Sequence, residues 1–189
     1  MLTKISFENA SDRQEALKSL LRDYNVPDCL FPYDWLCSTD FFTAPASCGY
    51  HSAYEGGLFD HCFNVTRILL DWGEKELTSV WMRPESPILV GMLHDITKID
   101  RYIKETAEDP NEVRYTKNPL FFGFGGHGYD SACKAELHCS LTEEEKACIQ
   151  YHMGAYEGDW YAIDYAIQKY PNVLWTHIAD MVASKLMED

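Results

Sequence analysis

Apolar residues recur along much of the chain at the spacing that places them on one face of an α-helix. Residues 11–24 show this pattern after a candidate N-cap at Ser11. The pattern returns after Gly56-Gly57, a tight-turn signal that leads into a helix carrying His61 and apolar residues up to Trp72. Further helices are predicted for residues 86–98, 129–139, 142–152, 160–170 and 173–186.

Two of these helices have clear start signals. Ser86 and Pro87 are the residue types of an N-cap and a first helical position. Thr142 and Glu145 have the spacing of a capping box, in which each side chain bonds to the backbone of the other residue. The predicted core-facing stripe of the last helix consists of Ile178, Val182 and Leu186.

Only two short segments have the character of β-strands. Residues 101–105 and 112–117 are predicted to form a small hairpin, joined by a polar turn around residues 108–111. Residues 26–50 are rich in proline, cysteine and aromatic residues, which favours short helices and turns. We therefore expect an all-α fold, a helical bundle with one small β-hairpin. A single domain spans residues 1–189, with residues 1–50 as an N-terminal helical extension packed on it.

Composition limits the functional classes. The chain has 16 basic and 30 acidic residues, a formal net charge of −14, which argues against non-specific binding of nucleic acid or of an anionic membrane. Its seven cysteines show no CxxC pairing, so we expect reduced thiols rather than disulfides or a zinc knuckle. No apolar run approaches the length of a membrane span. We expect a soluble, cytoplasmic protein, and the sequence gives no information on its oligomeric state.

The most informative stretch is His94-Asp95 within an otherwise apolar helix. Unpaired ionisable groups inside a protein cost several kcal/mol, roughly, unless a metal or a full set of hydrogen bonds satisfies them. Lys98 falls on the helical face between the two, which places a cation beside the carboxylate.

Four other ionisable residues occupy similar positions, on apolar helix faces or next to glycine turns, and together with His94 and Asp95 they give six candidate ligands. Imidazole nitrogen and carboxylate oxygen together suit Mn, Fe, Co, Ni or Zn, whereas all-oxygen sites suit Mg or Ca. Six ligands exceed the needs of one ion with an open position, so two ions are expected, with Asp95 bridging them. The roles of His51 and His177 stay open between orienting a ligand, gating a pocket and ordinary packing. The candidate ligands are His61, His94, Asp95, His127, His152 and Asp180.

The order of these residues, with the HDxxK extension to Lys98, resembles the HD-domain superfamily of metal-dependent phosphohydrolases. The run from His51 to His61, HSAYEGGLFDH, is similar to the first metal helix of bacterial HD proteins, including an exoribonuclease group with a GGLxxH stretch. GHG at 126–128, YHMG at 151–154 and HIADM at 177–181 look like the later segments of small HD hydrolases. The resemblance covers roughly residues 50–186.

This resemblance implies that His61, His94, Asp95 and Asp180 bind a first ion, and that His127 and His152 share Asp95 with a second. It implies hydrolysis of a phosphomonoester or phosphodiester, such as a nucleotide, by a metal-activated hydroxide. Asp95 and Lys98 would be catalytic, with Lys98 facing the substrate phosphate.

Arg67 and Tyr129 are further candidates for substrate binding, with ordinary packing as the alternative. The chain departs from small relatives after His127-Gly128, where Tyr129-Asp130-Ser131 replaces an acidic-basic pair.

Two other functions remain open from the sequence. Some HD-fold proteins, those of the inositol oxygenase type, have a similar ligand order and use two iron ions with O2. A non-catalytic nucleotide-binding module would also retain the site. The substrate, the metal and the number of ions are not distinguished by the sequence.

Overall fold

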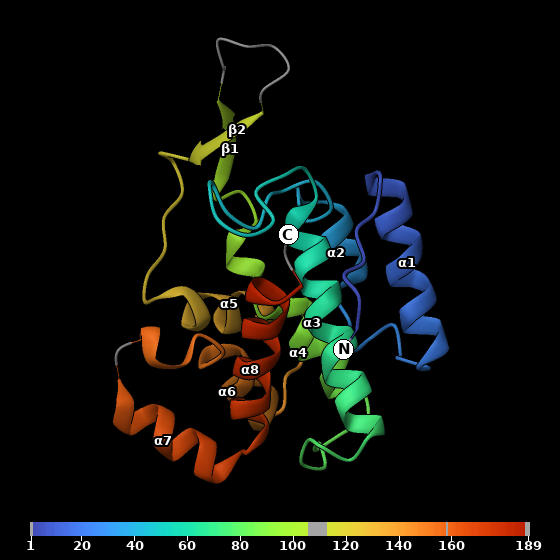
Figure 1. Ribbon diagram of the computed structural model, residues 1–189, viewed down its shortest axis with the longest axis vertical. Coiled ribbons are helices and arrows are strands. Elements are labelled where there is room, and N and C mark those ends of the chain that lie inside the picture. The colour runs from blue at the N-terminus through green and yellow to red at the C-terminus, as the bar shows by residue number, and fades with distance from the viewer. Residues whose placement is uncertain (1, 106–112, 158, 188–189) are drawn as a thin grey trace.

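The computed structural model describes residues 2–105, 113–157 and 159–187 (Figure 1). As expected, the protein is mainly helical with one small antiparallel sheet. The predicted polar turn at residues 108–111 lies outside the described residues. The elements are α1 Ala10–Asp23, α2 Tyr33–Cys37, α3 Gly57–Glu74, α4 Ser86–Leu93, η1 Ile96–Lys98, β1 Tyr102–Glu105, β2 Arg114–Lys117, α5 His127–Glu136, α6 Glu143–Gln150, η2 Gly154–Glu157, α7 Trp160–Lys169 and α8 Asn172–Lys185.

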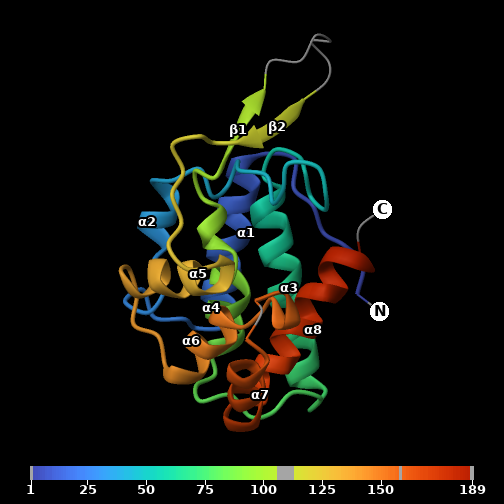
Figure 2. The same cartoon turned by 90° about the vertical axis from the view of Figure 1, so that its left-hand side faces the viewer.

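Helix α3 lies in the middle of the bundle and packs against α4 and α8. Helices α5 and α6 lie side by side, and α6 also packs on α8 (Figure 2). The hairpin projects from one end of this helical body, with Tyr102 paired to Lys117 and Glu105 to Arg114. The predicted strands are confirmed to within one residue at their described ends, and residue 112 lies outside the described residues.

Two predicted start signals are confirmed. Gly56 has φ 82°, a left-handed conformation that suits glycine, and it precedes the first residue of α3. Thr142 and Glu145 form the expected capping box, since each side chain bonds to the backbone N–H of the other. The predicted N-cap of the first helix is wrong by two residues, because the side chain of Asn9 rather than Ser11 accepts from the backbone N–H of Asp12.

The predicted continuous helix over residues 86–98 is also wrong, because α4 ends at Leu93 and a 3-10 turn follows. The side chain of His94 explains the break. Its Nδ1 donates to the carbonyl oxygen of Gly91 at 2.8 Å, the oxygen that the N–H of Asp95 would use in a continuing α-helix. Asp95 therefore leaves the helix with φ −112° and ψ 12°.

Smaller differences affect two other histidines. His127 is the first residue of α5 instead of the last residue of the preceding loop. His152 follows the end of α6 instead of lying in its last turns. Its Nδ1 donates to the carbonyl oxygen of Ile149 at 2.7 Å, as His94 does to Gly91. His94 is the C-cap of α4 and His152 lies two residues after the end of α6, so each histidine bonds back to the helix that precedes it.

The predicted stripe of α8 is only partly buried, since Leu186 is 60% exposed and Ile178 is half-buried, while Val182 packs against the core. Small residues, which permit close approach to α3, matter more here than large apolar ones. The buried face of α8 includes Val173, Thr176, Ala179 and Ala183.

The N-terminal region is tied to α3 through a buried arginine. Arg13 of α1 is 2% exposed, and its Nε donates to Asp60, which is fully buried, at 3.0 Å. The same guanidinium donates to the carbonyl oxygens of Phe7, Phe42 and Glu55. This one side chain therefore joins the N-terminal segment, the loop before α3 and α3 itself.

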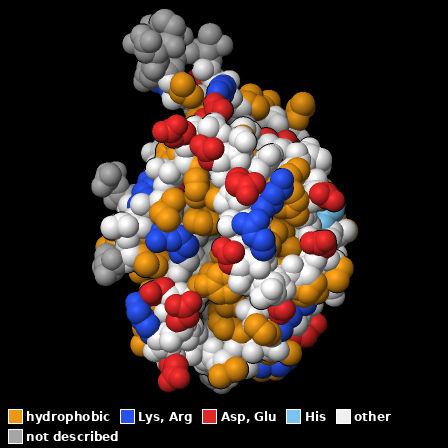
Figure 3. All heavy atoms as spheres, turned by 90° about the vertical axis from the view of Figure 1, so that its right-hand side faces the viewer, with side chains coloured by type: hydrophobic (Ala, Val, Ile, Leu, Met, Phe, Trp, Pro, Cys, Tyr) orange, Lys and Arg blue, Asp and Glu red, His pale blue; other side chains and the backbone are white. Residues whose placement is uncertain are grey.

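The chain has a mean hydropathy of −0.32, and its described helices agree with this low value. None of the helices in the described part of the chain combines the length and the hydropathy that a membrane-spanning segment requires. On the face shown in Figure 3, acidic and basic side chains are scattered among apolar ones.

Gly91 is a point of close approach between α4 and α3. A Cβ atom at this position would lie 2.3 Å from Thr66 Oγ1 and 2.6 Å from its Cα. We expect Gly91→Ala to lower the free energy of unfolding by about 1–3 kcal/mol, because the two helices must move apart. Urea denaturation measures this change.

Gly73→Ala is the matched control for that experiment, because a Cβ there would meet only Thr78 Oγ1, at 3.8 Å. This control should be neutral or stabilising by up to about 1 kcal/mol, since alanine favours a helix over glycine. Equal stability of Gly91→Ala and the wild type would contradict the close packing of α3 on α4.

Candidate metal centre

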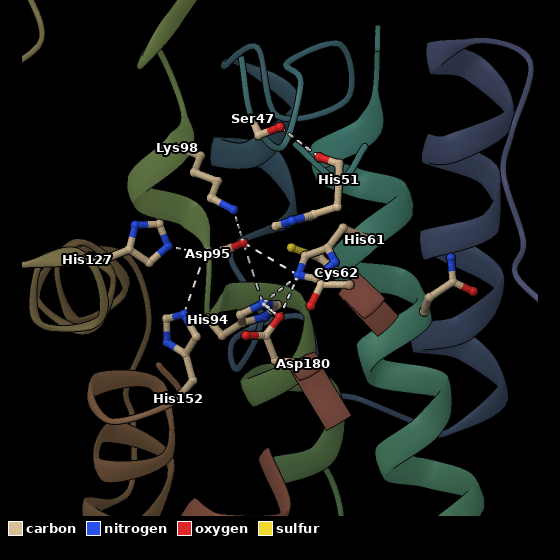
Figure 4. Close-up of polar contacts among 12 residues, drawn as sticks. Ser47, His51, His61, Cys62, His94, Asp95, Lys98, His127, His152 and Asp180 are labelled. Carbon is tan, nitrogen blue, oxygen red and sulfur yellow. Dashed lines mark hydrogen bonds and ion pairs between the residues drawn. The ribbon is translucent and has the colours of Figure 1, made fainter. Parts of the chain in front are cut away.

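The six predicted ligands come from five parts of the fold and point toward one region (Figure 4). Helix α3 supplies one histidine, the end of α4 supplies the His-Asp pair, and α8 supplies a carboxylate. The start of α5 and the end of α6 supply the other two imidazoles. Tertiary packing of α3, α4, α5, α6 and α8 therefore builds this centre.

One group of donors surrounds Oδ2 of Asp95. The Nε2 atoms of His61 and His94 lie 3.2 Å apart, and each lies 3.6 Å from this oxygen. Asp180 Oδ1 lies 3.0 Å from His61 Nε2. Of the four donors that the resemblance assigns to a first ion, His61, His94 and Asp95 are close enough to share one, and Asp180 contacts His61.

A second group surrounds the other oxygen, Oδ1, of the same carboxylate. His127 Nε2 contacts this oxygen directly, and His152 Nε2 lies 3.6 Å from it. Asp95 therefore lies between the two groups and turns one oxygen toward each. This is the arrangement that a bridging carboxylate requires.

The chemistry of these residues fits a transition-metal ion. Asp95 and the three histidines His61, His94 and His152 are each 2% exposed or less. Among the described residues, His61 Nδ1 and His152 Nε2 are buried without a hydrogen-bond partner. Such groups are costly to bury unsatisfied, and an ion bound at Nε2 of His152 would remove that cost. Imidazole and carboxylate donors are those that Fe, Mn, Co, Ni and Zn accept.

Two of the histidines are held in the tautomer that metal binding needs. The Nδ1 atoms of His94 and His152 each donate to a backbone carbonyl oxygen. Each Nε2 therefore keeps its lone pair in the neutral ring, and this lone pair is directed toward the centre. Burial lowers the pKa of His94 to about 3, so its ring is neutral at physiological pH.

Lys98 forms an ion pair with Asp95 at the centre. Its Nζ lies 2.6 Å from Asp95 Oδ2, and both side chains are buried. Burial opposes ionisation of Asp95, but Lys98, His127 and His94 outweigh it and hold the pKa of this carboxyl well below its usual range. Burial likewise lowers the pKa of Lys98, but Asp95 outweighs it and the net shift is upward. At neutral pH the pair is therefore a carboxylate and an ammonium.

A cavity of about 410 Å³ opens beside this pair. Its volume falls within the range of small-molecule sites. The walls combine charged, aromatic and thioether side chains. Lining residues include Asp95, Lys98, His127, Asp180, His51, His177, Tyr50, Tyr102, Tyr156, Met153 and Met181.

Arg67 and Tyr129, which the sequence offers as further substrate-binding candidates, do not line this cavity. Arg67 is six residues after His61, which turns it by about 240° to another face of α3. There it donates to Thr3 O and Asn64 Oδ1. Tyr129 is two residues after His127 and therefore faces away from it on α5. Tyr129 instead borders a separate cavity beside the aromatic loop before α5.

The histidines left open by the sequence both lie at the cavity. His177 Nδ1 donates to the carbonyl oxygen of His152 at 2.7 Å, so this ring supports the segment that carries a candidate ligand. The ring of His51 lies 5.0 Å from the ring of His61, measured between centroids.

One neighbour of the centre was missed by the sequence analysis. Arg101 Nη1 lies 3.4 Å from His127 Nδ1, and the guanidinium also lies over the ring of Phe121. The only sequence signal was its place directly after the HDxxK stretch.

Comparison with known proteins found a similarity over part of the chain. No known protein family and no solved structure was found to match the chain. The chain is similar to the dihydroneopterin 2',3'-cyclic phosphate phosphodiesterase of Methanocaldococcus jannaschii, with 39% identity over 64 residues. The similar segment covers 33% of this chain and 26% of that protein, so the chain matches about a quarter of the relative's length.

Proposed function

We propose that the protein is a metal-dependent phosphohydrolase of the HD superfamily that cleaves a phosphomonoester or phosphodiester, such as a nucleotide. The observation that carries the proposal is the position of Asp95 between two groups of histidines. Its two oxygens face two groups of imidazoles, and the ammonium of Lys98 contacts it at the wall of a cavity. The similarity to a phosphodiesterase supports phosphoester hydrolysis and favours it over oxygenase chemistry.

Two ions of Fe, Mn, Co, Ni or Zn fit the donors present. The first would be held by His61, His94, Asp95 and Asp180, and the second by His127 and His152 with Asp95. Bound there, such ions supply Lewis acidity toward a phosphoryl oxygen and lower the pKa of a water molecule that attacks phosphorus.

The protein's own residues prepare the site for this chemistry. Asp95 stays ionised, because the ammonium of Lys98 and the neighbouring imidazoles hold its pKa low in spite of burial. The ammonium of Lys98 has three N–H donors, and one of them is directed to Asp95. Another can be donated to a phosphoryl oxygen in the cavity. Charge that develops on the transferring phosphoryl group is thereby stabilised by a cation that is already in position.

Replacing Lys98 tests this role. We expect Lys98→Met to lower kcat/KM for a chromogenic phosphodiester about 100-fold or more, because a preorganised donor to the phosphoryl group is lost. Metal content, measured by elemental analysis, should be retained. Lys104→Met, which removes an exposed lysine paired with Glu55, is the control and should leave the rate unchanged. Hydrolysis by Lys98→Met within twofold of the wild type would exclude this role.

The reaction class is tested with the metal-loaded wild-type protein. We expect release of phosphate or of a phosphomonoester from a panel of nucleotides and chromogenic esters with Mn, Co, Ni or Fe. No cleavage with any of the four metals would refute the proposal. Substrate-dependent O2 uptake after anaerobic loading with iron would instead indicate an oxygenase, and nucleotide binding without turnover would indicate a binding module.

A further inference from the structure

His51 is a cavity residue that has no place in the ligand set. Its side chain lines the same cavity as Asp95 and Lys98. Its Nε2 is buried and has no hydrogen-bond partner in the part of the chain that the structure describes. The other extra histidine differs, since Nδ1 of His177 already bonds to a backbone carbonyl oxygen. His51 therefore lines the cavity and carries a buried polar atom that none of the described residues satisfies.

The loop that carries His51 is built to hold it. Ser47 Oγ donates to the carbonyl oxygen of His51 at 2.9 Å and accepts from the N–H of Tyr50 at 2.8 Å. The next residue, Ser52, is buried and has φ 48°, a left-handed conformation that is costly for a residue other than glycine. Strain of this kind persists where the surrounding structure imposes it, and it is concentrated at functional sites.

The start of α3 supplies that surrounding structure. The carbonyl oxygen of Ser52 accepts from the N–H of Ala46 at 3.0 Å. The same oxygen lies so close to Gly57 that a Cβ at Gly57 would be only 2.0 Å away. The His51 loop is thus packed directly on the helix that carries His61, which sets the position of one ring relative to the other.

The ring of His51 shares its space with Lys98. Figure 4 shows the imidazole of His51 and the ammonium of Lys98 converging on the same side of Asp95. Burial, together with the nearby His61 and Lys98, lowers the pKa of His51 to about 4, although Asp95 and Asp180 act in the opposite direction. The ring is neutral at physiological pH, so it carries one N–H donor. A neutral donor and an ammonium facing one space can hold two oxygens of an anionic group.

We propose that His51 is a substrate-binding residue whose Nε2 donates a hydrogen bond to a phosphoryl oxygen of the bound phosphoester. This inference rests on the proposed phosphohydrolase function. It assigns the phosphoryl group two protein contacts, one from Lys98 and one from His51. A hydrogen bond to a charged oxygen is stronger than one between neutral groups.

The experiment compares His51→Leu, His51→Gln and the wild type. Leucine removes the donor, whereas the side-chain amide of glutamine replaces the ring Nε2 with an N–H of similar reach. Calorimetry measures the Kd of inorganic phosphate for each metal-loaded protein, and hydrolysis of bis(p-nitrophenyl) phosphate gives kcat and KM. His138→Leu is the matched control, since His138 is exposed and stacks on Trp35.

We expect His51→Leu to weaken phosphate binding by about tenfold to a hundredfold and to lower kcat/KM by a similar factor. His51→Gln should recover most of both losses. Metal content should equal that of the wild type in all variants, and His138→Leu should match the wild type throughout.

Three results would overturn the inference. Unchanged phosphate affinity in His51→Leu would show that the ring does not contact the phosphoryl group. Loss of metal from this variant would make His51 a metal ligand instead. A wild-type protein that binds no phosphate would remove the proposed contact altogether. The proposed function is tested separately, because phosphate binding is measured without turnover. A wild-type protein that binds phosphate but cleaves no ester would refute hydrolysis alone.

Discussion

Replacing Asp95 by alanine is expected to abolish both metal binding and hydrolysis. Each oxygen of this carboxylate faces a different group of histidines, so its removal takes a donor from both proposed ions at once. It also leaves the buried ammonium of Lys98 without its anionic partner. We expect kcat/KM to fall by at least about a thousandfold, because the Lewis acid and the attacking nucleophile are lost together.

Three measurements check this expectation. Elemental analysis after desalting should find metal in the wild type and none in Asp95→Ala. Phosphate release should be at the background rate. Thermal unfolding should shift upward when Mn²⁺ is added to the wild type but not when it is added to the variant, because only a protein that binds the ion in its folded state is stabilised.

Two further variants separate charge from shape. Asp95→Asn keeps the volume of the side chain but loses its negative charge, and we expect it to resemble the alanine variant. Asp71→Asn removes a partly exposed carboxylate of α3 that pairs with Lys75, and it should keep both metal and activity. A folded Asp95→Ala protein with a full complement of metal would show that Asp95 is not a ligand.

Replacing Arg13 by alanine is expected to have the largest effect on stability. The change strands the Asp60 carboxylate, which is fully buried and pairs with the guanidinium at 3.0 Å. Tyr54 Oη still donates to this carboxylate, but no cation remains beside it. Breaking a buried pair from one side costs about 3–5 kcal/mol. We expect a loss of this size in the free energy of unfolding, measured by urea denaturation.

Arg22→Ala is the control within the same helix, since Arg22 is exposed and its side-chain hydrogen bond is to Ser19. Its effect should stay within about 0.5 kcal/mol. The double variant Arg13→Met with Asp60→Leu should be more stable than Arg13→Ala, because it removes the stranded charge. If Arg13→Ala and Arg22→Ala proved equally stable, Arg13 would not hold the N-terminal region on α3.

Local signals in the sequence were enough to locate several elements of the fold. The capping box at Thr142 and the turn at Gly56 depend only on nearby residues, so both were found. The end of α4 was missed because it depends on the hydrogen bond from the side chain of His94 to the carbonyl oxygen of Gly91. The buried face of α8 was missed because Ala179 and Ala183 gain burial from close helix packing, which apolar spacing alone does not reveal.

The same distinction applies to the candidate centre. The six expected ligands were identified through their order along the chain, and the structure brings them together. Arg67 and Tyr129 were chosen for their nearness in sequence to His61 and His127, but the turn of each helix carries them to another face. His51 opens the HSAYEGGLFDH run, but its role stays open in the sequence, because its unpartnered nitrogen exists only in the folded protein.

The bonds from His94 and His152 to their own helices place a double constraint on what evolution can accept at these positions. A substitute at either position must bond back to the preceding helix and must also offer a nitrogen lone pair to the centre. Asparagine or serine can bond to the backbone, but the lone pairs of these shorter side chains are on oxygen. His61 is under a single constraint, since its Nδ1 has no partner among the described residues. Divergence of this chain should therefore be possible at His61, through a change of ion, before it is possible at His94 or His152.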